Sequence, residues 1–323
     1  MKTFDHYDAH SLDEALGLLA NRCGKARINA GGTDLLGLLK DGVLPRYPEL
    51  IVNIKTIPGL GYIEEDGERL RIGALARLCE LAGSKLLRER YAVLCEAAGA
   101  VAGPQIRNVA TVGGNLCQDV RCWYYRYPAH LGGTMECARK GRGPCFAIKG
   151  DNRYHAILGG RKCFAVCPSD LAVAFAALGG QMTIVSPRGE RKIAVGDFYS
   201  PLGNGLADDE IVKEIDVAKA FGPGRQRFLK FTVRKPIDFA IVSVAAVTEE
   251  KNGVFANARI AIGGVAPGPF RAEKAEEKLI GKKPSEALAA EAAEAAVEGA
   301  RPLSKNGWKI EVAKALITRV IGS

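Results

Sequence analysis

The sequence Ile28-Asn-Ala-Gly-Gly-Thr-Asp-Leu35 joins a short apolar strand pattern to a pair of glycines and the start of an apolar helix. Adjacent glycines let backbone N–H groups approach an anion, Thr33 offers a hydroxyl, and the helix offers the positive end of its dipole. The stretch therefore suits a phosphate. It lacks the G-x-G-x-x-G fingerprint, so a Rossmann fold is not predicted. Taken alone, the motif is equally typical of a plain tight turn.

A second pair of glycines lies in Thr111-Val-Gly-Gly-Asn-Leu-Cys117, again beside hydroxyl and amide side chains. The alternative interpretation is a glycine bulge in a strand. Two such loops are more informative than either alone, because a pyrophosphate has two phosphates. Loops from different subdomains can close over it.

Local patterns around these loops indicate alternating helices and strands. Ser11 and Glu14 form a capping-box pattern ahead of a helix. The other expected helices lie at residues 35–40, 75–102, 170–178, 285–299 and 310–321. Expected strands lie at residues 26–30, 50–54, 70–72, 181–186, 228–233, 244–249 and 254–262. Gly222-Pro-Gly is the expected boundary before a C-terminal domain.

Residues 117–168 are rich in Gly, Arg and Cys and have little periodicity. They hold six of the nine cysteines, together with nine basic and three acidic residues, or +6 of the formal charge of +9. This concentration argues against a general surface for nucleic acid. The N-terminus shows no secretory signal, so disulfides are not expected and the cysteines suggest a metal site. The sequence contains no run of 18 apolar residues, so no membrane-spanning helix is expected. We expect a cytoplasmic protein.

Cys122, Cys137, Cys145 and Cys163 are separated by 14, 7 and 17 residues, without a C-x-x-C pair. This spacing fits neither a zinc ribbon nor the bacterial ferredoxin pattern, and it leaves zinc and iron–sulfur equally open. The surrounding Lys and Arg residues favour an anionic four-thiolate centre of either kind. His155 is a further candidate ligand, although a loop histidine is more often structural. No catalytic triad, carboxylate pair or Walker loop is evident, so we expect this chain to hold cofactors rather than attack substrates.

The two glycine motifs, in this order, resemble those of the FAD-binding subunit of the xanthine dehydrogenase/molybdenum hydroxylase family. The resemblance includes RIGALARL at 71–78 and PSDL at 168–171, and it spans essentially the whole chain. It implies an α+β fold with two α/β FAD-binding subdomains of the PCMH type, residues 1–55 and 56–221. Residues 222–323 would form a C-terminal α+β domain of the CO dehydrogenase flavoprotein type, with an antiparallel sheet and helices.

Flavin contacts are implied at matching positions, with Asp170 near the ribityl chain and Lys230 near the isoalloxazine. The implied set is Ile28, Asn29, Ala30, Gly31, Gly32, Thr33, Asp34, Leu35, Val101, Thr111, Gly113, Gly114, Asn115, Asp170, Val212 and Lys230.

The insertion at about 118–167 is similar to that of the 4-hydroxybenzoyl-CoA reductase β subunit and of some bacterial aldehyde oxidoreductase FAD subunits. There the extra loop carries a [4Fe–4S] cluster. The resemblance implies Cys122, Cys137, Cys145 and Cys163 as its ligands, with Cys167 as a rival to Cys163.

The implied function is electron relay by FAD and the [4Fe–4S] cluster. The implied partners are a molybdenum cofactor-binding large subunit, a small subunit with two [2Fe–2S] clusters, and an external carrier such as ferredoxin. No nucleic acid or membrane is expected as a partner. The alternatives are the FAD subunit of an aldehyde or xanthine/purine dehydrogenase, a stand-alone flavoprotein oxidoreductase, and a zinc-stabilised scaffold. Substrate chemistry is expected in another subunit.

Overall fold

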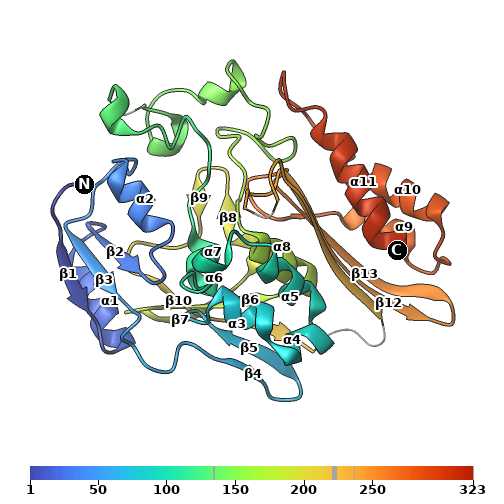
Figure 1. The fold of residues 1–323 in the computed structure, drawn as a ribbon, viewed down its shortest axis with the longest axis horizontal. Coiled ribbons are helices and arrows are strands. Elements are labelled where there is room, and N and C mark those ends of the chain that lie inside the picture. The colour runs from blue at the N-terminus through green and yellow to red at the C-terminus, as the bar shows by residue number, and fades with distance from the viewer. Residues whose placement is uncertain (134, 220–223, 236, 323) are drawn as a thin grey trace.

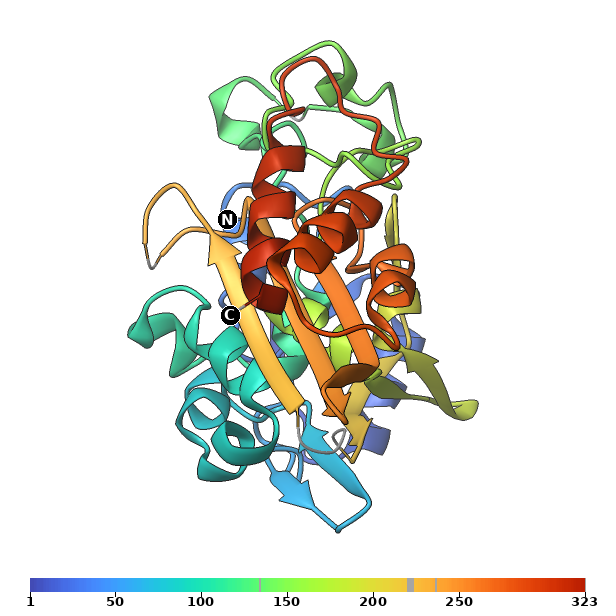
Figure 2. The same cartoon turned by 90° about the vertical axis from the view of Figure 1, so that its right-hand side faces the viewer.

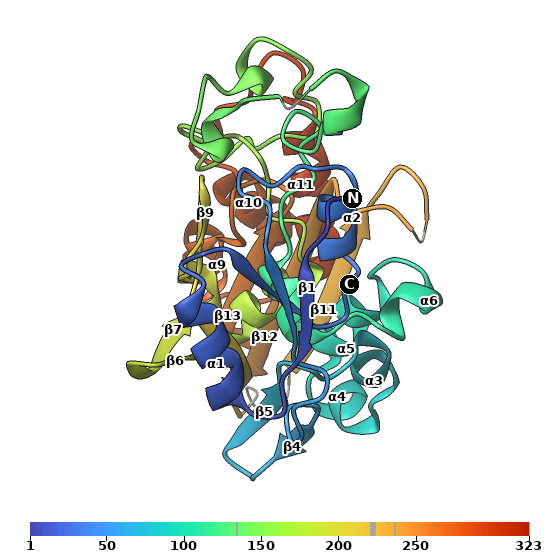
Figure 3. The ribbon, with the colours of Figure 1, turned by 90° about the vertical axis from the view of Figure 1, so that its left-hand side faces the viewer.

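Three main β-sheets follow one another along the chain in the computed structural model, which describes residues 1–133, 135–219, 224–235 and 237–322 (Figure 1). The first sheet is parallel, in the order β1-β3-β2, and Figure 3 shows it facing the viewer. Its central strand is buried along its whole length, as expected of a parallel sheet. The elements of this part are β1 (Asp5–Asp8), α1 (Leu12–Asn21), β2 (Ala26–Asn29), α2 (Leu35–Lys40) and β3 (Leu50–Asn53).

The second sheet is antiparallel, in the order β4-β5-β10-β6-β7. Its strands are β4 (Ile63–Glu65), β5 (Arg69–Gly73), β6 (Gln181–Ser186), β7 (Gly189–Ala194) and β10 (Ile211–Ala218). Its helices are α3 (Leu78–Gly83), α4 (Lys85–Arg90), α5 (Ala92–Gly99), α6 (Pro104–Arg107), α7 (Val112–Cys117) and α8 (Asp170–Leu178). A 3-10 turn (Val195–Asp197) and a small ribbon, β8 (Tyr199–Ser200) and β9 (Gly203–Asn204), complete this part. Every residue of α8 is buried, so this helix lies at the centre of the molecule.

The C-terminal sheet is antiparallel, in the order β11-β12-β13-β14, and separates two hydrophobic cores. Ala245 and Val247 of β12 belong to the core around α8, whereas Val244 and Ala246 belong to the core under the last three helices (Figure 2). This alternation follows from the two-residue period of a strand. The elements are β11 (Gly224–Phe231), β12 (Val242–Lys251), β13 (Val254–Gly263), β14 (Phe270–Arg271), α9 (Glu273–Leu279), α10 (Glu286–Ala296) and α11 (Lys309–Gly322).

The cysteine insertion, residues 118–168, projects at one end of the molecule, drawn green at the top of Figure 1. Outside residue 134, its only regular elements are the 3-10 turns Ala129–Leu131, Ala138–Lys140 and Phe146–Ile148. The segment before α11 runs beside it (Figures 1 and 2). Its described residues join no sheet. They are held by side chains and by single backbone hydrogen bonds, such as those from the N–H groups of Ile157 and Leu158 to the Val265 carbonyl at 2.9 and 3.0 Å.

The α+β fold class is confirmed, as is the capping of α1, where Ser11 accepts a hydrogen bond from the backbone N–H of Glu14 at 3.1 Å. The strand-bulge alternative for the second glycine loop is wrong, because Thr111 caps α7 and the glycines lie inside that helix. Strand β11 ends at Phe231, two residues earlier than expected. Of the expected boundary at Gly222-Pro-Gly, residues 222 and 223 lie outside the described residues, and Gly224 is the first residue of β11. Within the described part of the chain, no helix is long and apolar enough to span a membrane.

Candidate functional site

The first glycine loop, residues 30–34, connects β2 to α2 and lies directly against the chain just before α7. A Cβ atom on Gly31 would lie 2.4 Å from the Val109 carbonyl oxygen and 2.9 Å from the Ala110 Cα, so only glycine fits there. Gly32 has a φ of +69°, which also favours glycine. Among the described residues, the backbone N–H groups of 31–34 have no hydrogen-bond acceptor. They form a cluster of donors available to an anion.

In the second glycine loop, the backbone N–H groups already donate to acceptors in the protein. Val112 N–H donates to the Ala76 carbonyl at 2.9 Å, Gly113 N–H to the Ala74 carbonyl at 2.8 Å, and Gly114 N–H to the Thr111 hydroxyl at 3.2 Å. A Cβ on Gly113 would lie 2.9 Å from the Ala74 Cβ. The two loops therefore differ: the first presents free N–H groups, and the second provides a closely packed wall.

A chain of polar contacts links the second loop to Asp170 and Lys230. The Ser169 hydroxyl donates to the Asn115 side-chain oxygen at 2.6 Å, and it also caps α8 by accepting from Ala172 N–H at 3.0 Å. The Lys230 ammonium on β11 lies 2.6 Å from the Asp170 carboxylate. Both side chains are over nine-tenths buried. Burial raises the pKa of Asp170, and the Lys230 ammonium opposes that rise.

Lys230 also donates to the Ala100 carbonyl at 2.9 Å, which places it beside the segment of Val101. The predicted residues in 28–35, 111–115, Asp170 and Lys230 thus lie on connected elements. Val212 differs, because its side chain is 5% exposed and belongs to the core around α8, next to a β-bulge in β10. Its role at a flavin stays a prediction.

Four cysteines of the insertion line one pocket, although they are far apart in the sequence. These are Cys122, Cys137, Cys145 and Cys163. Leu38 and Val43, within and just after α2, pack in the same hydrophobic cluster as Cys137 and Cys163, so the pocket lies against the helix that follows the first glycine loop. In the described part of the chain, no three His, Cys, Asp or Glu side chains are grouped as ligands of a single metal ion.

The pocket is electrostatically suited to an anion. Lys140 is 9% exposed, and its ammonium has no hydrogen-bond partner among the described residues. Burial lowers the pKa of Lys140, and the thiols of Cys137 and Cys122 act in the opposite direction. A hydrogen bond from Cys163 lowers the pKa of Cys145 to about 6, which favours a thiolate.

The other two cysteines of this region lie elsewhere. Cys117 and Cys167 pack with the core around α8, and neither lines the pocket. Burial raises the pKa of each to about 12. Contact with Cys145 and burial raise the pKa of Cys163 as well, so the position of the side chains, and not their acidity, separates Cys163 from Cys167. These observations favour Cys163 over Cys167 as a ligand.

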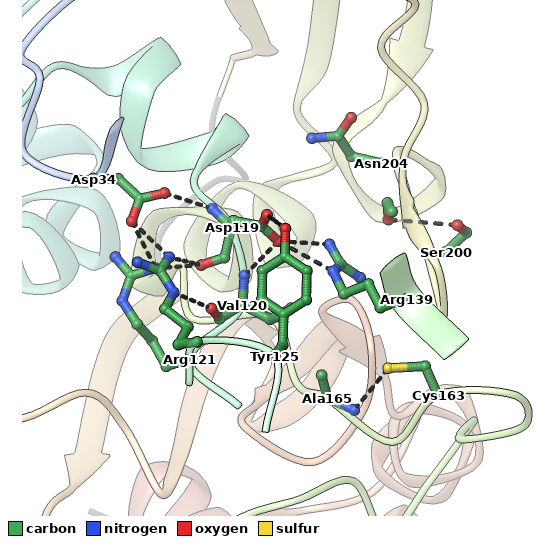
Figure 4. Close-up of polar contacts among 12 residues, drawn as sticks. Asp34, Asp119, Val120, Arg121, Tyr125, Arg139, Cys163, Ala165, Ser200 and Asn204 are labelled. Atoms are coloured by element: carbon green, nitrogen blue, oxygen red, sulfur yellow. Dashed lines mark hydrogen bonds and ion pairs between the residues drawn. The ribbon is translucent and has the colours of Figure 1, made fainter. Parts of the chain in front are cut away.

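An ion-pair network joins the first glycine loop to the insertion, as Figure 4 shows. The Asp34 carboxylate lies 2.9 Å from Arg121 and 2.7 Å from Arg126, and it accepts the Asp119 N–H at 2.8 Å. Asp119 in turn pairs with Arg139 at 2.9 Å. Sequence reasoning assigned Asp34 only to the flavin and did not anticipate these pairs. The available signal was the excess of arginine in the insertion.

Comparisons with known proteins match this architecture over nearly the whole chain. A family described as the FAD binding domain in molybdopterin dehydrogenase matches residues 2–219, and the CO dehydrogenase flavoprotein C-terminal domain matches residues 227–323. The aldehyde oxidoreductase FAD-binding subunit PaoB of Escherichia coli is 34% identical, over 99% of this chain and 98% of the relative. The carbon monoxide dehydrogenase medium chain of Hydrogenophaga pseudoflava is 27% identical, over 99% and 96%.

Among solved structures, quinoline 2-oxidoreductase from Pseudomonas putida 86 superposes with a TM-score of 0.77 at 26% identity, covering 99% of this chain and 97% of that one. Carbon monoxide dehydrogenase from Hydrogenophaga pseudoflava gives a TM-score of 0.77 at 26% identity, covering 99% and 96%. The chain belongs to the FAD-binding medium subunits of the xanthine dehydrogenase/CO dehydrogenase family.

Proposed function

We propose that this chain is the electron-transfer subunit of a molybdenum hydroxylase complex, with FAD held between the two glycine loops. The observation that carries the proposal is the contact of Gly31 with the segment at Val109, which brings both loops to one place. The free N–H groups of residues 31–34 would bind the pyrophosphate. The side-chain oxygen of Asn29, which is buried and has no partner among the described residues, is available to a hydroxyl or amino group of the cofactor.

The remaining predicted flavin residues are assigned by their position relative to these loops. Asp170 and Lys230 would lie along the ribityl chain and isoalloxazine, because Ser169 and Asn115 connect them to the second loop. A buried ion pair there would fix the orientation of the ring system without itself reacting. We also propose that the two FAD-binding subdomains span residues 1–55 and 56–221 and that the C-terminal domain spans residues 222–323.

The cysteine pocket is proposed to hold a [4Fe–4S] cluster on Cys122, Cys137, Cys145 and Cys163. A cluster with four thiolate ligands is net anionic. The buried Lys140 ammonium near these thiols, which lies over the Tyr125 ring and has no hydrogen-bond acceptor among the described residues, supports such an occupant. When bound, FAD exchanges one or two electrons and the cluster exchanges one. The Asp34 network would hold the two cofactor sites in a fixed relative position.

The proposed partners are a molybdenum cofactor-binding large subunit, a small subunit with two [2Fe–2S] clusters, and an external one-electron carrier such as ferredoxin. Between the two substrate classes raised by the resemblance, the full-length similarity to an aldehyde oxidoreductase subunit favours an aldehyde-oxidising complex. A complex acting like 4-hydroxybenzoyl-CoA reductase would instead move electrons towards molybdenum. We propose a cytoplasmic location for either complex.

The decisive experiment is anaerobic purification with co-expressed partner subunits, followed by analysis of flavin, iron, sulfide and zinc. In the complex we expect one FAD and about eight irons and eight sulfides, with about four of each from this chain and about four from the two [2Fe–2S] clusters of the small subunit. Both cofactors of this chain should be reduced when an aldehyde is added. Bound flavin together with zinc and only the roughly four irons of the small subunit would contradict the cluster in this chain and leave the flavin assignment intact. Substrate oxidation by the isolated chain would contradict the subunit role.

A further inference from the structure

A buried histidine contacts one of the four pocket cysteines. The Nε2 atom of His155 lies 3.2 Å from the Cys122 sulfur, and the residue is 3% exposed. Its other ring nitrogen, Nδ1, is buried and has no hydrogen-bond partner among the described residues. The contact with Cys122 is therefore the polar interaction that the imidazole makes in the described structure.

The C-terminal domain holds this histidine in place. The fully buried Lys309, at the start of α11, donates to the His155 carbonyl at 3.0 Å. Asn306, also fully buried, donates to the same carbonyl at 3.1 Å. The indole of Trp123 meets the imidazole edge-on, with ring centroids 5.4 Å apart. The backbone and the ring of His155 are thus fixed by residues that are not pocket cysteines.

Because Nε2 faces the sulfur, the ring nitrogen that carries the proton decides whether His155 donates or accepts the hydrogen bond. A neutral imidazole protonated on Nδ1 would bury that N–H without an acceptor and direct a lone pair at the sulfur. The tautomer protonated on Nε2 donates to the sulfur and buries no Nδ1–H. In this tautomer His155 is the donor and Cys122 the acceptor.

We propose that His155 is a positioning residue that donates a hydrogen bond to the Cys122 thiolate and raises the reduction potential of the cluster held there. The inference rests on the proposed function, because it requires the cluster. A donor to a ligand sulfur stabilises the reduced, more negative cluster more than the oxidised one. The C-terminal domain would thereby influence the electron transfer that the flavin domain carries out.

The test is an EPR-monitored redox titration of the purified complex with His155→Phe, which keeps a planar ring and removes both nitrogens. We expect the cluster potential to fall by about 59 mV, equal to a tenfold change in a one-electron equilibrium. His155→Gln offers an amide N–H and should restore most of the loss. His130→Phe, at an exposed histidine of the same insertion, should leave the potential unchanged.

Each outcome separates this inference from the function on which it rests. A His155→Phe complex with full iron content and the wild-type potential would overturn the inference and leave the proposed function standing. If His155→Phe loses iron, a His155→Gln complex with full iron and a near wild-type potential supports the donor role. Loss of iron in both variants overturns it, because His155 would then be a ligand or a purely structural residue. A wild-type complex that holds only the roughly four irons of the small subunit would overturn both the inference and the proposed cluster.

Discussion

The flavin loops and the cysteine insertion lie side by side, but they are held by different interactions. The first glycine loop follows a strand that pairs with β3, and the second is bonded through its backbone to Ala74 and Ala76 next to β5. The insertion has no strand in its described residues. It is held by buried side chains together with single backbone hydrogen bonds, such as that from Ala129 N–H to the Asp41 carbonyl at 2.8 Å. Asn152 is an example of such a side chain: it is fully buried and bonds to the Ala147 carbonyl and to the N–H of Lys305.

This difference shows how a second cofactor site can be added to a fold without altering its sheets. Strand pairing and backbone hydrogen bonds place the flavin loops, and a few side-chain bonds, such as those of Thr111 and Asn115, add to them. The insertion requires particular ion pairs and amide contacts at the points where it meets α2 and the C-terminal domain. We therefore expect the flavin site to respond to backbone crowding and the cysteine site to respond to side-chain changes.

The largest expected effect is that of Gly31→Ala, because the new methyl group meets backbone atoms of the second loop at 2.4 and 2.9 Å. The two loops would have to separate, and we expect loss of FAD from the purified protein, measured by flavin absorbance after gel filtration. Gly37→Ala is the matched control, since a Cβ there has no neighbour within 4 Å and alanine favours the helix α2 by roughly 1 kcal/mol. Retention of full FAD by Gly31→Ala would contradict the proposed contact.

Cys137→Ser should remove the iron while FAD stays bound, because the cysteine pocket and the flavin loops are placed by separate interactions. Iron and sulfide analysis, together with flavin absorbance, measure the two effects in one sample. Cys23→Ser is the control, since Cys23 is exposed and lies outside the insertion. Loss of both cofactors in Cys137→Ser would show that the insertion is needed for the flavin site as well.

The same difference explains which parts were predictable from the sequence. Helix α8 and strand β6 were predicted with their observed limits, because their apolar runs are local signals. Strand β1 was missed because its four residues, DHYD, are exposed and show no apolar pattern. Strand β10 was missed because Glu214 and Asp216 interrupt its apolar pattern; both are buried and pair with arginines of β5.

At the candidate site, the sequence predicted the glycine loops and the four pocket cysteines. It did not predict the polar side chains that contact them. The pairs of Asp34 with Arg121 and Arg126, and the contact of His155 with Cys122, join segments far apart in the chain. No local pattern encodes such contacts. They depend on how the insertion folds back over α2 and α11.

Lys230→Met should have the next largest effect, because it leaves the buried Asp170 carboxylate without its partner. Breaking a buried ion pair in this way costs about 3–5 kcal/mol. The folded-state pKa of Asp170, already raised by burial, would rise further. The folded variant then keeps its proton to higher pH than the unfolded chain, so stability falls as pH rises from the unfolded pKa of about 3.9 through the folded pKa.

Denaturant unfolding of Lys230→Met at pH 5 and at pH 8 would test whether its stability falls as the pH rises. We expect the deficit relative to wild type to be larger at pH 8. Lys213→Met removes an exposed pair with Glu190 and should cost less than about 1 kcal/mol at either pH. An equal deficit for Lys230→Met at both pH values would mean that Asp170 finds another counter-charge.

Asp34→Asn tests the junction between the two regions and should have the smallest effect. Its carboxylate is 15% exposed, and the two arginines keep other acceptors at the carbonyl of Asp119. Charge-assisted hydrogen bonds of this kind contribute about 1.5–3 kcal/mol. We expect lower thermal stability and partial loss of both FAD and iron, since Asp34 contacts both regions.

The control for Asp34→Asn is Glu136→Gln, which removes a pair with Arg142 inside the insertion. Both side chains of that pair are more than half exposed, so the change should cost less than about 1 kcal/mol and leave both cofactors in place. Iron loss without flavin loss in Asp34→Asn would mean that the ion pairs serve the insertion alone. If FAD and iron are lost to the same extent, the ion pairs of Asp34 stabilise the flavin loops and the cysteine insertion together, although the two regions are held by different interactions.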